Sequence, residues 1–203
     1  METIACAPHK GRPREFCIDM ALAAALRVFW SKGYEGASLT DLTEAMGITR
    51  PSLYAAFGNK EALFRKALDL YESEKLAYVA KALEAPTARG VAERLLYGVV
   101  ENNASSCEPR GCLGVIASVA CGAEAESIRG EVLERGAKAK RKLVERFERA
   151  KAEGDLPDNI GAEHLTTYLN AIMQGMSVQA GAGASREDLE RVVETSLLIW
   201  PTK

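Results

Sequence analysis

The sequence predicts an all-α fold with about nine helices, on the basis of three observations. Apolar residues recur at the three- and four-residue spacing of a helix face along most of the 203-residue chain. Helix-capping residues, glycines and prolines separate these segments. No alternating apolar and polar run bounded by hairpin turns is present, so no strand is predicted. The 47% hydrophobic content suits a sizeable core, and no apolar run approaches the roughly 18 residues of a membrane span. We therefore expect a globular protein with no membrane partner.

The first helix is expected from Ile18, where a regular apolar stripe begins that continues to Trp30. Lys32 and Gly33 are typical of a helix end, because a cation suits the last turn and glycine adopts left-handed backbone angles easily. The stripe predicts that Phe29 and Trp30 are core residues.

Two short helices are expected next, separated by a tight turn at Gly47. Ser38 and Asp41 stand three residues apart, as in a capping box, and predict the first of these helices. Thr49 is a suitable cap for the second, which should run over residues 50–57 with a proline in its first turn. Residues 16–58 are therefore expected to form a compact three-helix unit.

The rest of the chain, residues 59–203, is also predicted to be helical. Helices are expected at residues 60–83, 87–100, 112–121, 124–153, 162–179 and 186–200. On the fourth of these, Glu131 and Arg135 stand four residues apart, which indicates a solvated face. The last two helices have apolar faces so wide that they suggest a partner helix from a second copy of the chain.

Charge and cysteine content restrict the functional class. The formal net charge is only −2, but residues 1–66 carry nine lysines and arginines against seven acidic residues, so a phosphate-facing surface is expected in this part. The five cysteines at 6, 17, 107, 112 and 121 form neither an even framework nor a CxxC pair, and no secretory signal is apparent. We expect the protein in the reducing cytoplasm.

A short helix, a glycine turn and a second short helix together form a helix-turn-helix, whose second helix, residues 49–57, enters the major groove of DNA. The sequence reads GRPREF and then ALRVFWSKGYEGASLTDLTEAMGITRPSLYAAFGNKEALF. Residues 12–66 thereby resemble the DNA-binding domain of the TetR/AcrR family of transcriptional regulators, through the G-Y turn, the A-x-G-I-T turn, the L-Y-x-x-F helix and the following K-E-x-L. Residues 67–203 resemble only the general layout of the family's ligand-binding and dimerising helices.

The resemblance implies a homodimeric regulator, a repressor, that binds a near-palindromic operator in double-stranded DNA. Binding of an unknown small molecule by the C-terminal part would release it. The implied domains are a flexible basic arm at residues 1–15, the DNA-binding domain at 16–58, and an effector-binding and dimerisation domain at 59–203.

The resemblance and the side-chain chemistry together predict which residues contact DNA. Arg50 can make a bidentate contact with a guanine edge and is expected to read a base. Lys60 begins a helix, where its ammonium and the backbone N–H groups suit a phosphate. The full predicted set is Arg12, Arg14, Ser38, Thr40, Thr49, Arg50, Pro51, Ser52, Tyr54 and Lys60. Of these, Arg12 and Arg14 lie in the arm and would reach a minor groove.

Polar or amphipathic groups within the otherwise apolar C-terminal helices are candidates for an effector pocket. They are Tyr97, Cys112, His164, Tyr168 and Gln174. Each of them could equally be an ordinary packed residue.

Alternative functions were weighed against this hypothesis. Cys112 follows Arg110 at a helix start, where a cation and the helix favour a thiolate, so the chain could be a DNA-binding thiol or electrophile sensor. An enzyme has little support, because the chain has two histidines and no phosphate-binding glycine loop. Cys6, His9 and Cys17 could supply three zinc ligands, but a fourth is missing. We expect no catalytic site, no metal and no cofactor.

Overall fold

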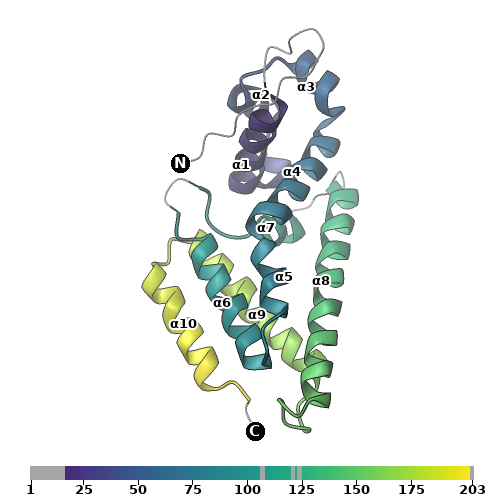
Figure 1. Cartoon of the computed structure of the whole chain (residues 1–203). Coiled ribbons are helices and arrows are strands. Elements are labelled where there is room, and N and C mark those ends of the chain that lie inside the picture. The colour runs from purple at the N-terminus through teal and green to yellow at the C-terminus, as the bar shows by residue number, and fades with distance from the viewer. Residues whose placement is uncertain (1–16, 106–107, 120–121, 123–124, 202–203) are drawn as a thin grey trace.

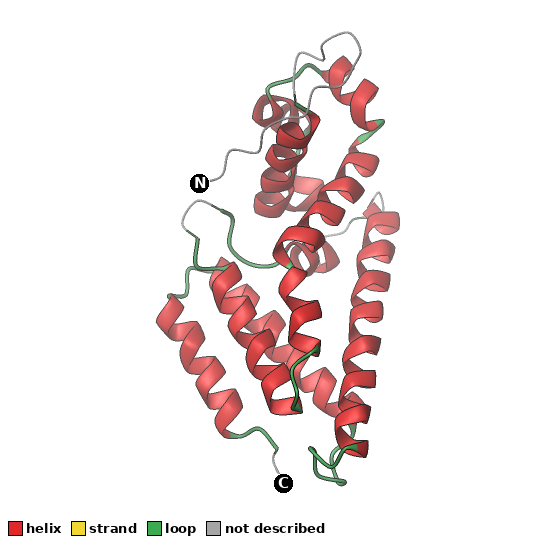
Figure 2. Cartoon of the chain, viewed as in Figure 1, coloured by secondary structure: helices red, strands yellow, loops and turns green. Residues whose placement is uncertain are grey.

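The computed structural model describes residues 17–105, 108–119, 122 and 125–201. Within these residues all regular structure is helical, which confirms the predicted fold class (Figure 2). The helices are α1 (Ile18–Gly36), α2 (Leu39–Met46), α3 (Arg50–Phe57), α4 (Lys60–Lys75), α5 (Ala77–Leu83), α6 (Ala88–Asn102), α7 (Leu113–Val119), α8 (Glu126–Ala152), α9 (Ala162–Gly181) and α10 (Arg186–Leu198). The arm with Arg12 and Arg14 lies outside the described residues.

The described residues form ten helices instead of about nine, because the predicted helix over residues 60–83 is divided. At Leu76 the backbone angles, φ −103° and ψ 7°, depart from those of an α-helix, so α4 ends and α5 begins there. Residues 74–77 at this break, Glu-Lys-Leu-Ala, are all good helix formers with no glycine or proline among them, so the sequence carries no local signal for it.

Helix ends follow the capping signals in the sequence. Gly33 has φ 71° and ψ 177°, so the regular part of α1 stops where predicted, and a short turn completes the segment to Gly36. Thr87 caps α6 by accepting a hydrogen bond from the Gly90 N–H. Ser185 caps α10 in a full capping box with Asp188.

Two hydrophobic clusters make up the core. The first lies among α1 to α4 and also takes in Leu113 and Ala117 of α7 and Ile128 and Val132 of α8. The predicted core residues Phe29, Trp30, Leu53 and Phe57 all belong to it, each with at most 4% of its surface exposed. Packing in this cluster thus extends past residue 58 into α4.

The second cluster holds the C-terminal helices together. It is centred on fully buried residues of α6, α8 and α9 and on Trp200, whose ring centroid lies 5.9 Å from that of Phe147. Figure 1 shows α1 to α4 at one end of the molecule and α6, α9 and α10 at the other. Helix α8 begins where the two ends meet, near the lower part of α4, and continues along the C-terminal end. Helix α7 lies at this junction. In the described part of the chain, no helix is long and apolar enough to cross a membrane.

Candidate nucleic-acid interface

Helices α2 and α3 are joined by the tight turn that the sequence predicts. Gly47 has the left-handed angles φ 65° and ψ 32°, which a side chain would disfavour. The N–H of Ile48 donates to the Thr43 carbonyl at 3.0 Å, which closes the end of α2. The turn therefore fixes α3 against α2 as a helix-turn-helix, and we call α3 the recognition helix.

The recognition helix starts on a well-formed cap. The Thr49 hydroxyl accepts a hydrogen bond from the Ser52 N–H at 3.3 Å, and Pro51 stands in the first turn, where no backbone donor is needed. Thr49, Arg50 and Pro51 are exposed, and Ser52 is half-buried. The first turn of α3 is therefore open to a ligand.

Arg50 is held in place by the neighbouring helix. Its Nη2 donates to Oγ1 of Thr40 in α2, 2.9 Å away, and both residues are exposed. One edge of the guanidinium is thereby tethered, while the remaining N–H groups stay available to donate hydrogen bonds to a base edge.

The other hydroxyls of the predicted set have different surroundings. Ser38 donates to the Asp41 carboxylate at 2.7 Å and accepts from the Asp41 N–H at 3.0 Å, so it is engaged in its capping box. Hydrogen bonds from Lys32 and then from Ser38 lower the pKa of Asp41 to about 2. Tyr54 is 48% exposed, unlike its buried neighbours in the recognition helix, so its phenol lies at the surface as expected.

Lys60 lies at the first residue of α4, after the cap formed by the Asn59 side chain on the Ala62 N–H. Its Nζ stands 4.6 Å from the centroid of the Tyr34 ring, a cation–π contact. Partial burial lowers the pKa of Lys60, and the nearby Glu35 carboxylate opposes that shift. The ammonium is therefore positioned by an aromatic face at the edge of the helix-turn-helix.

The predicted effector residues do not form one site. His164, Tyr168 and Gln174 are exposed on α9, and Tyr97 is a half-buried residue packed against the second core cluster. The structure does not bring these four together with Cys112. A polar residue on an apolar helix thus marks the outer face of α9 here.

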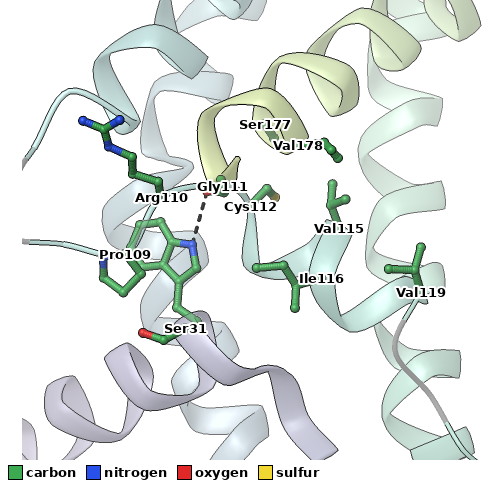
Figure 3. Close-up of a pocket in the computed structure, with 12 residues that line it drawn as sticks. Ser31, Pro109, Arg110, Gly111, Cys112, Val115, Ile116, Val119, Ser177 and Val178 are labelled. Atoms are coloured by element: carbon green, nitrogen blue, oxygen red, sulfur yellow. Dashed lines mark hydrogen bonds between the residues drawn. The ribbon is translucent and has the colours of Figure 1, made fainter. Parts of the chain in front are cut away.

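Cys112 lies in a surface hollow of about 500 Å³ at the junction of α1, α7 and α9 (Figure 3). The hollow is lined by Trp30, Ser31, Pro109, Arg110, Gly111, Cys112, Val115, Ile116, Val119, Ser177, Val178 and Gly181. Trp30, predicted only as a core residue, also donates from Nε1 to the Gly111 carbonyl at 3.2 Å and so connects α1 to the loop before α7.

The proposed activation of Cys112 by Arg110 has little structural support. The Arg110 guanidinium donates to the Ala184 carbonyl at 3.4 Å and is directed away from the thiol (Figure 3). The following helix, α7, has only seven residues, so its dipole is small. Cys112 is instead packed against the core cluster that contains Tyr71, whose pKa is raised first by burial and then by the nearby Cys112. Within the described residues no group of three histidine, cysteine or acidic residues could hold a metal ion; Cys6 and His9 lie outside that part.

Comparison with known proteins finds a matching family model for each half of the chain. The family model "Bacterial regulatory proteins, tetR family" matches residues 21–67, and "Tetracyclin repressor-like, C-terminal domain" matches residues 90–196. The HTH-type transcriptional repressor ComR of Escherichia coli strain K12 is 35% identical over 95% of this chain and 92% of its own length. The repressor BdcR of the same strain is 30% identical over 88% and 86%.

Among solved structures, a cysteine variant of the TetR-family regulator CifR in complex with a 26bp double-strand operator DNA is similar. It is 44% identical, has a TM-score of 0.88, and the match covers 94% of this chain and 100% of that one. Two family models, full-length relatives and the same helix-turn-helix thus agree, and the chain belongs to the TetR family of bacterial transcriptional regulators.

Proposed function

We propose that the protein is a transcriptional repressor that binds a near-palindromic DNA operator as a homodimer and is released by a small-molecule effector. The observation that carries this proposal is the exposed first turn of the recognition helix, with Arg50 tethered to Thr40 and open to a base edge. CifR, solved with its operator, and the repressors ComR and BdcR support the same activity here.

Contacts to the DNA backbone would come from the groups around Arg50. Lys60, Thr40 and the Tyr54 phenol are at the surface of the helix-turn-helix, and each can meet a phosphate. The arm of residues 1–15, with Arg12 and Arg14, would add minor-groove contacts. Residues 16–58 form the DNA-binding domain in this proposal, and residues 59–203 the effector-binding and dimerisation domain.

Dimerisation is proposed through α9 and the end of α10. Large apolar side chains are exposed there: Tyr168 at 38%, Val178 at 58%, Leu198 at 85% and Ile199 at 63%. Such side chains suit a two-fold bundle in which the same helices of a second copy cover them. The protein would act in the cytoplasm, where its DNA lies.

A selection experiment tests this function. The purified protein is incubated with random duplex DNA, bound molecules are amplified over several rounds, and the enriched sequences are read. We expect an inverted repeat whose half-sites lie about one helical turn, or a multiple of it, apart. Enrichment of no sequence, or of a single unrepeated site, would contradict the proposal.

A second candidate function, a thiol or electrophile switch at Cys112, is favoured by one observation. Cys112 lines the junction hollow beside Trp30 and is packed against the core cluster that contains Tyr71 of α4, so an adduct there would disturb contacts between the two halves of the molecule. Treatment with iodoacetamide tests it: the sulfur bonds to the reagent carbon, iodide leaves, and the thiol proton passes to buffer. Release from operator in the parent and none in Cys112→Ser would support the switch, whereas equal release in both would exclude it.

A further inference from the structure

Helices α4 and α8 face each other with a row of charged and polar side chains that no function described so far uses. On each helix the participating positions recur at three- or four-residue spacing, so they occupy one face. They are Glu61, Arg65, Asp69 and Glu72 on α4, and Ser127, Glu131 and Arg135 on α8. We call this set the α4–α8 network.

At the end nearer the recognition helix, Arg65 connects the two helices. Its Nε donates to the Glu131 carboxylate at 2.6 Å, and its Nη2 donates to Glu61 of its own helix at 2.5 Å. Glu61 also accepts a hydrogen bond from the Ser127 hydroxyl. Hydrogen bonds from Ser127 and then from Arg65 lower the pKa of Glu61, so its carboxylate remains charged under neutral conditions.

At the other end, Arg135 binds three carboxylates. Its Nη1 lies 2.7 Å from Asp69 and 3.0 Å from Glu72 of α4, and its Nη2 lies 2.6 Å from Glu131 of α8. The Arg135 and Glu131 side chains are only 27% and 25% exposed, so solvent and salt screen this pair less than they screen the pair with Asp69, which is 62% exposed. Burial raises the pKa of Glu131, but the hydrogen bonds from Arg135 and Arg65 outweigh it and hold the pKa below its usual value.

The α4–α8 network acts on the DNA-binding domain because α4 is directly connected to the recognition helix. Helix α4 follows the recognition helix after only Gly58 and Asn59, and its residues pack in the same core cluster as α1 to α3. At its far end the break at Leu76 separates α4 from α5. The direction of α4 relative to α8 is therefore not fixed by a continuous helix, and the side contacts between the two helices act on it together with the packing of the first core cluster.

Few other polar contacts are recorded between the two halves of the described chain. Trp30 binds the Gly111 carbonyl, Glu35 accepts from the Gly122 N–H at 2.7 Å, Lys75 pairs with Glu108, and Asn102 of α6 donates to the Lys75 carbonyl at 2.6 Å. These contacts lie toward α7, its flanking loops and the end of α6, whereas the α4–α8 network covers about three turns of α4 and about two turns of α8. The α4–α8 network thus joins the DNA-binding helices to α8 through a row of ion pairs and hydrogen bonds.

We propose that Arg135, together with its partner Glu131, is a positioning residue for operator recognition, although neither can reach DNA from α8. The α4–α8 network fixes the angle of each DNA-binding domain and hence the separation of the two recognition helices in the dimer. This inference rests on the proposed function of operator binding as a homodimer.

A matched pair of variants tests the proposal. Arg135→Met removes the guanidinium and leaves Asp69, Glu72 and Glu131 facing one another, while Arg141→Met removes the same charge from an exposed position on α8. Both are titrated against the selected operator and against operators with one base pair added or removed between the half-sites. Arg135→Lys is included because an ammonium keeps the charge but not the planar fork.

We expect Arg135→Met to bind the operator of native spacing about 2- to 30-fold more weakly than Arg141→Met does. On operators with altered spacing, the loss of affinity in Arg135→Met should be smaller, so this variant should distinguish less between spacings. Arg135→Lys should recover part of the lost affinity for the native spacing. Thermal unfolding is recorded for Arg135→Met and Arg141→Met, because three carboxylates left without Arg135 repel one another and lower stability, and all titrations are run well below the lower midpoint. Equal weakening at every spacing, or equal behaviour of Arg135→Met and Arg141→Met, would overturn the proposal.

A measurement without DNA separates this inference from the proposed function. A spin label is attached through an unnatural amino acid at the exposed position 55 of the recognition helix, and the distance between the two labels of a dimer is recorded. We expect a broader distance distribution in Arg135→Met than in the parent or Arg141→Met, and an unchanged distribution would overturn the inference. Failure of the parent protein to select any operator would instead contradict the proposed function alone.

Discussion

Nη2 of Arg50 donates a hydrogen bond to Oγ1 of Thr40 at 2.9 Å, so the first residue of the recognition helix is braced by the preceding helix. A free arginine side chain samples many rotamers, and ordering it costs conformational entropy when DNA binds. The brace reduces that cost, because part of the side chain is already fixed in the free protein. It also gives Thr40, predicted as a backbone contact, a second role in directing the base-reading group.

Replacement of Arg50 tests base readout. Arg50→Ala should weaken operator binding by about 1–3 kcal/mol and relax the preference at one base pair, since a bidentate contact to a base is lost. Thr40→Val keeps the shape but removes the acceptor, so it should weaken binding less and leave the same base pair preferred. Affinities are measured on operators mutated at each position. Arg89→Ala on α6 is the control for loss of one cation. If Arg50→Ala and Arg89→Ala have the same operator affinity and the same base preference, Arg50 has no readout role.

Lys60 is expected to contact a phosphate and to carry no sequence information. Lys60→Ala should weaken binding to all sequences alike and lower the slope of log affinity against log salt by about one. Tyr34→Leu removes the ring under the ammonium but keeps the charge, so the slope should stay that of the parent. A Lys60→Ala slope equal to the parent slope would exclude the phosphate contact.

The exposed apolar residues of α9 and α10 predict where the second copy binds. Leu198→Glu places a charge on a side chain that is 85% exposed, so the chain should still fold, but it should sediment as a monomer at micromolar concentration and lose operator binding. Leu133→Glu, on a half-exposed residue of α8, is the matched control and should remain dimeric. A dimeric Leu198→Glu would place the interface elsewhere. Val193 of α10 is fully buried in its own chain, so a charge placed there reports on folding instead of dimerisation.

The capping box of α2 predicts an unusual titration. Because the hydrogen bond from Lys32 depresses the Asp41 pKa, the stabilisation that this carboxylate provides is present above its ordinary pKa of about 3.9 and is lost as the pH falls through about 2. Carboxyl chemical shifts in a pH titration should place the Asp41 midpoint near 2 in the parent and higher in Lys32→Met. A parent midpoint near the ordinary value would show that the Lys32 contact does not persist in solution.

The DNA-binding half could be predicted largely from sequence, because its determinants are local. The pairs Ser38 and Asp41, and Thr49 and Ser52, stand three residues apart, and their capping bonds form within one helix turn. Gly47 likewise fixes its own turn. Such short-range chemistry leaves a pattern in neighbouring residues.

The junction of the two halves could not be predicted in this way. The sequence suggests a solvated pair for Glu131 and Arg135, and the pair does exist at 2.6 Å, but both residues also bind α4. Arg65 and Glu131 stand 66 positions apart, and only tertiary packing brings them together. The charges at residues 61, 65 and 69 have a spacing that matches this partner face, which is the one signal that the sequence offers. On α9 the polar residues His164, Tyr168 and Gln174 lie on the exposed face of the helix, so their place in an apolar segment indicated the surface and not a pocket.

The most direct test of operator binding by two recognition helices is a hydroxyl-radical footprint of the purified protein on its selected DNA. The proposal predicts two protected segments of equal strength, related by a two-fold axis, with centres about 34–36 Å apart along the duplex or a multiple of that distance. Arg50→Ala should weaken both segments together. Protection of one segment only, or no protection at protein concentrations that saturate the selected DNA, would contradict it.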